Sequence, residues 1–267
     1  MDDLERPSPK GMALRRPSLQ PRTQARVRTS TSPALPRRHV DVDRAWADTG
    51  LLCALARRPV LLDKILDLYG ASLVVAEGVA AEIRRLSGIS EAQRTPQTRL
   101  LCSGADTVVR YLDDGQIVEC PLPAGSDTFD TFDKLDRVRR QLRGIDAAAA
   151  ERAGRTVDAV TSAHKHAGEM HSIVCAARTV DLGRQTVLLT NDGGAITVAE
   201  SHGVPCKDLG QLLAELGCEA DPVDAAELFN SFNEVTRTFA TVPAHRQPAD
   251  ASAFRCLKHG DICRLCD

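Results

Sequence analysis

The clearest pattern in the chain is a short apolar run that is followed by an acid, two glycines and a helical repeat. Residues 187–190 are a continuous apolar segment closed by a small threonine, which is typical of a strand buried in a parallel sheet. Asp192 follows, the glycine pair lets the chain turn, and residues 195–201 have helical spacing before a second apolar run at 204–206. The pattern predicts a strand, helix, strand unit with Asp192 at the C-terminal end of the first strand.

Similar alternations of apolar runs and helical stretches recur between residues 39 and 216. They predict strands within 40–47, 72–75 and 116–120, and helices at 51–56, 60–69, 78–86, 129–142, 170–180 and 208–216. A helical pattern over 87–109 is interrupted by Pro96. In the helix at 129–142, the buried stripe is predicted to be Phe132, Leu135, Val138 and Leu142. Strands that alternate with helices favour the α/β class.

Composition agrees with a layered α/β interior. Hydrophobic residues make up 43% of the 267 residues, but aromatic residues only 3%, so Val, Leu, Ile and Ala must fill the core. No apolar run approaches the roughly 18 residues that span a bilayer, and the N-terminus lacks an apolar signal core. We therefore expect a cytoplasmic protein that has no membrane partner.

Four regions are predicted along the chain. Residues 1–38 carry nine basic and three acidic side chains without apolar periodicity, so we expect a disordered arm of charge +6. Such an arm would attract phosphate backbones or would remain a solvated tail. The folded domain is expected at 39–217, a helix and linker at 218–252, and a separate Cys/His segment at 253–267.

The cysteines fall into two groups. Six are scattered among apolar neighbours, which predicts small buried side chains in a reducing compartment: Cys53, Cys102, Cys120, Cys175, Cys206 and Cys218. The other three cysteines lie near the C-terminus with one histidine, and these four potential ligands have short knuckle spacings that suit tetrahedral Zn²⁺: Cys256, His259, Cys263 and Cys266. The alternative is a flexible reducing tail without metal. If metal is bound, this tail would contact RNA or a partner.

Four acids are predicted to meet at one rim of the sheet. Asp48 and Asp192 end strands, whereas Glu82 and Glu169 lie on helices, and sites in open α/β sheets form at the carboxyl ends of the strands. Carboxylates gathered in this way repel one another unless a hard cation such as Mg²⁺ or Mn²⁺ neutralises them. Such an ion activates water and offsets charge on a phosphate, which predicts metal-assisted phosphodiester hydrolysis.

Each acid also has a purely structural alternative. Asp48 is well placed to cap a helix, Asp192 to form a turn, and Glu169 to favour a helix dipole. Glu82 could be a solvated helix residue, and Glu77 competes with it for the same role.

Three histidines surround Glu169 in the sequence, namely His164, His166 and His171. We expect side chains in such positions to lie on the surface or to contact substrate rather than to ligate a metal.

Four segments of the chain resemble PIN domains. They are ADTGLL around Asp48, VVAEGVAAE ending at Glu82, GEMHSI around Glu169 and LLTND ending at Asp192, and the resemblance covers roughly residues 39–216. It implies a three-layer α/β/α fold with a mostly parallel central sheet and a ribonuclease that depends on Mg²⁺ or Mn²⁺. Many small bacterial members, the VapC-like toxins, cut RNA and are silenced by an antitoxin.

Roles for individual residues follow from the same resemblance. Asp48, Glu169 and Asp192 would hold the metal, and Glu82 would complete the acidic set. Thr190 and Asn191 would orient the strand end or a metal-bound water.

The expected function is therefore endoribonucleolytic cleavage of RNA. An antitoxin or another protein is expected as a further partner, and the expectation is compatible with an oligomer. Two alternatives remain open at this stage. One is a scaffold that binds RNA or protein without cutting, and the other is a structure-specific DNA nuclease.

Overall fold

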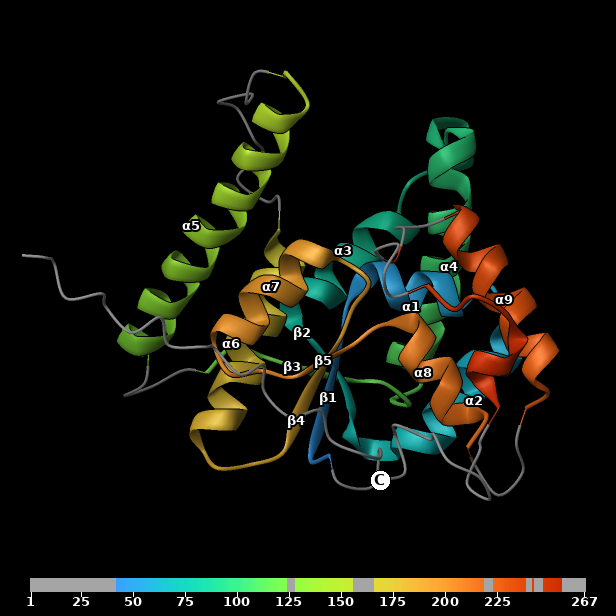
Figure 1. The fold of residues 1–267 in the computed structure, drawn as a ribbon. Coiled ribbons are helices and arrows are strands. Elements are labelled where there is room, and N and C mark those ends of the chain that lie inside the picture. The colour runs from blue at the N-terminus through green and yellow to red at the C-terminus, as the bar shows by residue number, and fades with distance from the viewer. Residues whose placement is uncertain are drawn as a thin grey trace, which may run out of the picture. The chain divides into compact units, whose positions relative to one another are not determined.

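The computed structural model describes residues 42–123, 128–155, 166–218, 223–238, 242 and 247–255 (Figure 1). The expected basic arm, His164 and the Cys256, His259, Cys263 and Cys266 segment lie outside these residues. Among the helices that are described, none has both the length and the apolar character needed to cross a membrane.

The described strands form one parallel sheet in the order β3-β2-β1-β4-β5. Their bounds are Arg44–Ala47 for β1, Leu73–Ala76 for β2, Val118–Cys120 for β3, Thr186–Leu189 for β4 and Cys206–Lys207 for β5. The chain builds outward from β1 through β2 to β3, then returns to add β4 and β5 on the other side. The strand order therefore reverses between β1 and β4, which is where open α/β sheets place their sites.

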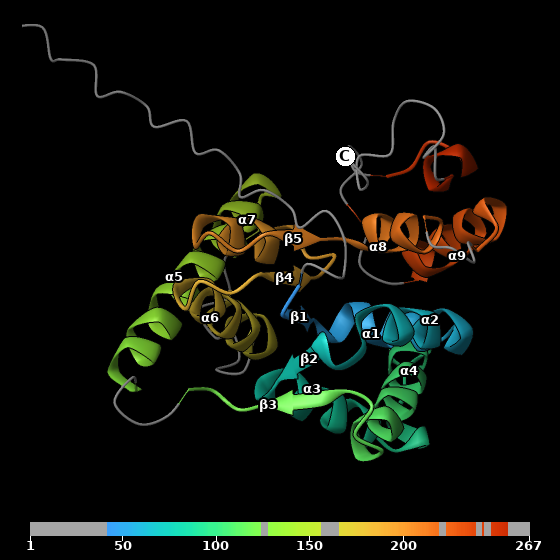
Figure 2. The same cartoon turned by 90° about the horizontal axis from the view of Figure 1, so that it is seen from below.

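Helices cover both faces of the sheet (Figure 2). One layer contains α1 (Thr49–Leu55), α2 (Pro59–Tyr69), α3 (Glu77–Ser87), α4 (Pro96–Asp113), α8 (Leu209–Leu216) and α9 (Ala225–Thr238), with the short 3-10 turns η2 (Gly70–Ser72), η3 (Glu91–Gln93) and η6 (Ala251–Phe254). The other layer contains α5 (Thr128–Arg152), α6 (Ala167–Asp181) and α7 (Gly193–Ser201). The predicted three-layer α/β/α fold with a parallel sheet is confirmed.

The sheet separates two apolar cores, one between the sheet and the α1 layer, called the α1-side core, and one between the sheet and the α6 layer. Side chains that alternate along each strand contribute to one core or the other. In β1, Ala45 and Ala47 face the layer of α1, whereas Trp46 faces the layer of α6. The α1 layer is packed very closely, because a Cβ added at Gly104 of α4 would lie 2.1 Å from the carbonyl oxygen of Cys53 in α1. Only glycine fits at that crossing.

Residues after α8 continue the α1-side core. Leu228 and Phe232 of α9 are buried in it, and the rings of Phe229 and Phe232 lie 6.4 and 6.2 Å from that of Phe254. A Cβ at Gly217 would lie 2.1 Å from the Phe254 carbonyl oxygen. Helix α9 and turn η6 therefore close this side of the domain.

Two local expectations from the sequence are wrong. Pro96 does not interrupt a helix but begins α4, since Thr95 caps that helix by accepting from the Thr98 N–H, and a first-turn proline loses no bond. Phe132 is not part of the buried stripe of α5, because its side chain is 62% exposed. Thr131, which is 4% exposed, takes the inward position at that turn.

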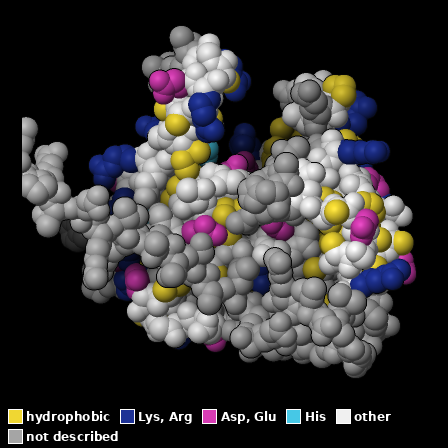
Figure 3. Space-filling model, in the orientation of Figure 1, with side chains coloured by type: hydrophobic (Ala, Val, Ile, Leu, Met, Phe, Trp, Pro, Cys, Tyr) yellow, Lys and Arg dark blue, Asp and Glu magenta, His cyan; other side chains and the backbone are white. Residues whose placement is uncertain are grey.

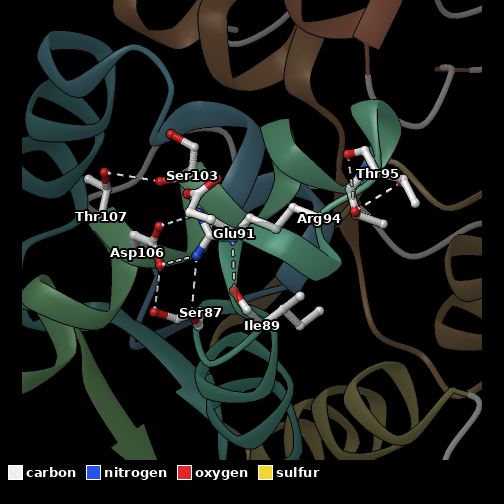
Figure 4. Close-up of polar contacts among 9 residues, drawn as sticks. Ser87, Ile89, Glu91, Arg94, Thr95, Ser103, Asp106 and Thr107 are labelled. Carbon is white, nitrogen blue, oxygen red and sulfur yellow. Dashed lines mark hydrogen bonds and ion pairs between the residues drawn. The ribbon is translucent and has the colours of Figure 1, made fainter.

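The loop between α3 and α4 is fixed by Arg94 (Figure 4). The guanidinium donates to the carbonyl oxygens of Ile89 (2.9 Å) and Ser87 (3.3 Å), and it pairs with Asp106 of α4 at 3.0 Å. Ser87 Oγ donates to the same carboxylate at 2.7 Å. These bonds tie the C-terminal end of α3 to α4, so the helix that carries Glu82 is held in place.

A fully buried lysine stabilises the β5 edge of the sheet. Lys207 Nζ lies 3.0 and 3.1 Å from the two carboxylate oxygens of Glu215, and 3.1 Å from the hydroxyl oxygen of Tyr69. Tyr69 donates to Glu215 at 2.8 Å, and the Lys207 side chain has no exposed surface. The two charges compensate each other inside the α1-side core.

We expect Lys207→Met to lower the free energy of unfolding by about 3–5 kcal/mol, because it removes the cation that compensates the buried Glu215 carboxylate. Urea denaturation at neutral pH measures this loss. The double variant Lys207→Met with Glu215→Leu is the control, and it should recover most of the stability because no lone charge remains. A Lys207→Met protein as stable as the wild type would contradict the pairing.

Candidate active site at the strand reversal

The parallel pairing of β1 with β4 places Asp48 and Asp192 at the same rim of the sheet. Ala47 lies opposite Leu189 in the register, and the Asp48 N–H donates to the Leu189 carbonyl oxygen at 3.0 Å. Each acid then follows the end of its strand and begins the next helix, α1 for Asp48 and α7 for Asp192.

Thr190 connects the two acids. Its hydroxyl donates to Asp48 Oδ2 at 2.6 Å and accepts from the Asp192 N–H at 3.1 Å. The second oxygen of Asp48 accepts from the Gly50 N–H at 2.9 Å, so this carboxylate is also a helix cap. The capping and functional interpretations of Asp48 are compatible, because each carboxylate oxygen has a further lone pair for a ligand.

Asp192 caps α7 from an exposed position. Its Oδ1 accepts from the Ala195 N–H at 2.6 Å. A Cβ at Gly194 would lie 3.0 Å from that same oxygen, so the glycine leaves room for the carboxylate to fold over the helix N-terminus. The glycine pair in the sequence therefore serves both the turn and the cap.

Glu169 lies in the first turn of α6 beside His166. The His166 backbone has a φ of 66°, a left-handed conformation that non-glycine residues seldom adopt and that is often found at functional sites. Its ring is placed between two acids, with Nε2 2.8 Å from Asp146 Oδ2 and Nδ1 3.8 Å from Glu169 Oε2. Asp146 belongs to α5, so α5 and the start of α6 meet at this ring.

Glu82 is held between the starts of α1 and α6. Thr49, the residue after Asp48, donates to Glu82 Oε2 at 2.9 Å. A Cβ at Gly168 would lie 2.9 Å from that oxygen and 3.5 Å from Thr49 Oγ1, so α6 begins directly against this pair. Glu77, the alternative acid on α3, lies instead beside His171, with 3.7 Å between Oε1 and Nδ1.

Burial and mutual repulsion set the charge states of the acids. Burial raises the pKa of Asp48 to about 7, and the charges of Glu169 and Asp192 add to this rise against the opposing hydrogen bond from Thr190. Burial also raises the pKa of Glu82, helped by the charge of Glu169. Glu169 and Asp192 therefore lie close enough to Asp48 to raise its pKa, and Glu169 lies close enough to Glu82 to do the same.

His166 compensates one member of the cluster. Burial alone would raise the pKa of Glu169, but His166 and the backbone N–H of Glu169 itself lower it below its usual value. In return Glu169 raises the pKa of His166, against burial and together with Asp146. His166 thus favours the ionised form of Glu169, whereas the surroundings of Asp48 keep it partly protonated near neutral pH.

The chemistry of these donors fits a hard divalent cation, which would relieve the crowding that raises the pKa of Asp48. Asp48, Glu169 and Asp192 are the residues that would hold it. In the part of the chain that the structure describes, however, no three His, Cys, Asp or Glu side chains form a group that could hold a metal ion. Metal binding would therefore need these carboxylates to move closer together.

Asn191 points away from the acids. It is buried, and its Oδ1 accepts from the Leu209 N–H at 2.9 Å, which ties the end of β4 to the start of α8. Of the two roles expected for it, the geometry agrees with orienting the strand end rather than a water.

Sequence reasoning missed two residues of this site. Thr49 could have been found, because it directly follows a strand-end acid and carries a hydroxyl. Asp146 has no local signal, since only the packing of α5 on α6 brings it to His166, which lies 20 positions away in the sequence.

Comparison of the chain with protein-family models and with curated proteins finds no match. Its function is therefore inferred from the residues at this rim and from their geometry.

We expect Asp48→Asn to stabilise the metal-free protein at high pH. The pKa of Asp48 is about 7 in the folded protein and 3.8 ordinarily, so the folded state binds the proton more tightly than the unfolded state does. The protonated Asp48 side chain therefore favours folding fully below pH 3.8, and this contribution is lost as the pH rises through 7. Asn cannot ionise, and the gain over the wild type should approach about 4 kcal/mol at pH 8 and vanish near pH 4.

Urea unfolding in EDTA across this pH range measures the difference. The exposed Asp114→Asn is the matched control, and it should change stability little at any pH. If Asp48→Asn shifts stability by the same amount at pH 4 and pH 8, Asp48 does not carry the burial cost described here.

Proposed function

We propose that this protein is a divalent-metal-dependent endoribonuclease that hydrolyses RNA phosphodiester bonds. The observation that carries the proposal is the convergence of Asp48, Glu169 and Asp192, with Glu82 beside them, where the strand order reverses. Each of these carboxylates has a hydrogen-bond or ion-pair partner of its own, but gathering them at one rim still costs free energy through their mutual repulsion, which a bound cation would offset. Perturbed acids in one cluster are typical of functional sites.

The residues at the rim have distinct roles in this proposal. Asp48, Glu169 and Asp192 would hold Mg²⁺ or Mn²⁺, which when bound supplies an activated water and offsets phosphate charge. Thr190 orients the Asp48 carboxylate, and Thr49 orients Glu82. Such hydrogen bonds to ligands fix ligand geometry and support metal affinity.

His166 brings positive charge to the same rim. Glu169 and Asp146 raise the pKa of its ring, which favours the protonated form near neutral pH. A protonated ring at this position holds Glu169 ionised and offers a favourable charge to an approaching phosphate.

A second candidate is an RNA-binding scaffold that keeps this fold but does not cut. The observation in its favour is that the described side chains do not form a three-ligand metal group. The two candidates differ in a single measurable property, which is cleavage of a bound RNA.

We expect the full-length protein to cleave single-stranded RNA with Mn²⁺ and to lose this activity in EDTA. Asp192→Asn and Asp48→Asn should each reduce the cleavage rate by at least about 100-fold, and Thr190→Val should weaken metal affinity by about 10- to 100-fold through loss of the Asp48 contact. Gel analysis of a labelled RNA over a Mn²⁺ titration measures both effects.

Glu77→Gln is the matched control for Glu82→Gln, since both acids lie on α3 and only Glu82 is held beside Asp48. We expect Glu82→Gln to slow cleavage by about tenfold and Glu77→Gln to leave it unchanged. RNA that is bound but uncut with Mn²⁺ would establish the scaffold instead. Preferential cutting of flapped DNA would overturn RNA as the substrate, and undiminished cleavage by Asp192→Asn would refute the metal site.

A further inference from the structure

One flank of α5 presents an exposed aromatic ring and two arginines in a row. Phe132, Arg139 and Arg143 are spaced by seven and four residues, which places all three within a sector of about 40° around the helix and over about 16 Å of its length. All three side chains are exposed, and this set is called the α5 flank below.

The arginines of the α5 flank have no ion-pair partner in the described residues. Arg140, on the next face of the helix, differs because it pairs with Asp136 at 2.9 Å. Phe132 is also unusual, since no other aromatic side chain is exposed among the residues whose burial is described. The exposed ring and the two arginines together provide an aromatic face and cations, which are the side chains that contact single-stranded nucleic acids.

The α5 flank leads directly to the acidic rim. One turn beyond Arg143, Asp146 contacts His166 at the start of α6. Ile145 packs against Gly194 at the start of α7, where an added Cβ would lie 3.5 Å from its Cγ2. Helix α5 therefore touches the starts of both helices that carry Glu169 and Asp192.

The surface around α5 agrees with this path. Figure 1 shows α5 running along the outside of the α6 and α7 layer and extending past it. Figure 3 shows Lys and Arg side chains along this helix, and a hollow between its far end and α4 in which acidic and histidine side chains are visible. Positive charge thus lines the approach, and negative charge lies at its end.

Cations spaced along a groove with an aromatic platform are the features that hold single strands. Arginine neutralises phosphates, and an exposed ring stacks on a base, which a duplex keeps within its own stack. We propose that the α5 flank binds single-stranded RNA and leads it to the acidic rim, with Arg139 and Arg143 on phosphates and Phe132 under a base. This inference rests on the proposed function, since it takes RNA as the substrate.

Binding measured without cleavage tests the α5 flank. Fluorescence anisotropy of a labelled single-stranded RNA is recorded with the full-length protein in EDTA over a salt series. The double variant Arg139→Gln with Arg143→Gln should bind at least about tenfold more weakly and reduce the salt slope by about 1.4, as expected for two lost phosphate contacts on a single strand. Phe132→Ala should weaken binding by about tenfold and leave the slope unchanged.

Arg137→Gln is the matched control. Arg137 is an exposed arginine of the same helix, but it lies toward His202 of α7, whose pKa it lowers in addition to the effect of burial. We expect this variant to bind RNA like the wild type. Because the N-terminal arm is present in every protein compared, its contribution cancels.

Two results would overturn the α5 flank as an RNA site. One is equal affinity and salt slope for the double arginine variant and Arg137→Gln. The other is duplex RNA that binds as tightly as the single strand with the same dependence on Phe132.

Weaker binding of the variants together with no cleavage in Mn²⁺ would support the α5 flank and refute the nuclease. Cleavage with no loss in any variant would support the nuclease and refute the α5 flank.

Discussion

The pairing of β1 with β4 is the constraint on which the rest of this structure depends. These strands are separated by about 140 residues, yet the hydrogen bond from Thr190 to Asp48 joins the two chain segments where the strands end. The strand order reverses at this pair, and the helices that follow β1 and β4 pack on opposite faces of the sheet, which is the arrangement at which open α/β sheets place their sites. The helices that start there, α1, α6 and α7, bring their own acids to the same place. The cluster of carboxylates is therefore a product of long-range topology and has no local origin.

Two charge arrangements within one sheet show how differently the fold treats buried ions. At the β5 edge, Lys207 and Glu215 compensate each other fully and lie inside an apolar core. At the β1 and β4 ends, Asp48 is only partly buried, but its neighbours are further acids, and desolvation together with their charges raises its pKa to about 7. The first arrangement supports stability once the pair is complete, whereas the second costs stability at neutral pH. A protein retains such a cost where the charge serves a function.

The positions of Asp48 and Asp192 after their strands could be predicted from the sequence, because the signals for a strand end are local. An apolar run that ends in an acid and two glycines locates Asp192, and positive φ at Gly70 agrees with the end predicted for α2. Prediction from the sequence failed where burial depends on neighbours from elsewhere in the chain. The period of α5 could not decide between Phe132 and Thr131 for the inward position, and nothing near Asp146 indicates that it meets His166. The capping role of Asp48 could not be separated from a chemical role by sequence, since the same carboxylate can serve both.

Helix α5 links the acidic rim to the surface of the protein. Through Asp146 it holds His166, which keeps Glu169 ionised, and through Ile145 it packs on the turn that begins at Asp192. The same helix carries exposed cations beyond the rim, so a change in its position would alter the charge state of Glu169 and the approach to it together. Helix α5 packs on α6 and α7 through one row of apolar side chains that includes Leu135, Val138 and Leu142, while Arg139 and Arg143 on its flank are exposed. In the proposed nuclease, the charge state of Glu169 and the approach of RNA would thereby be coupled through a single element.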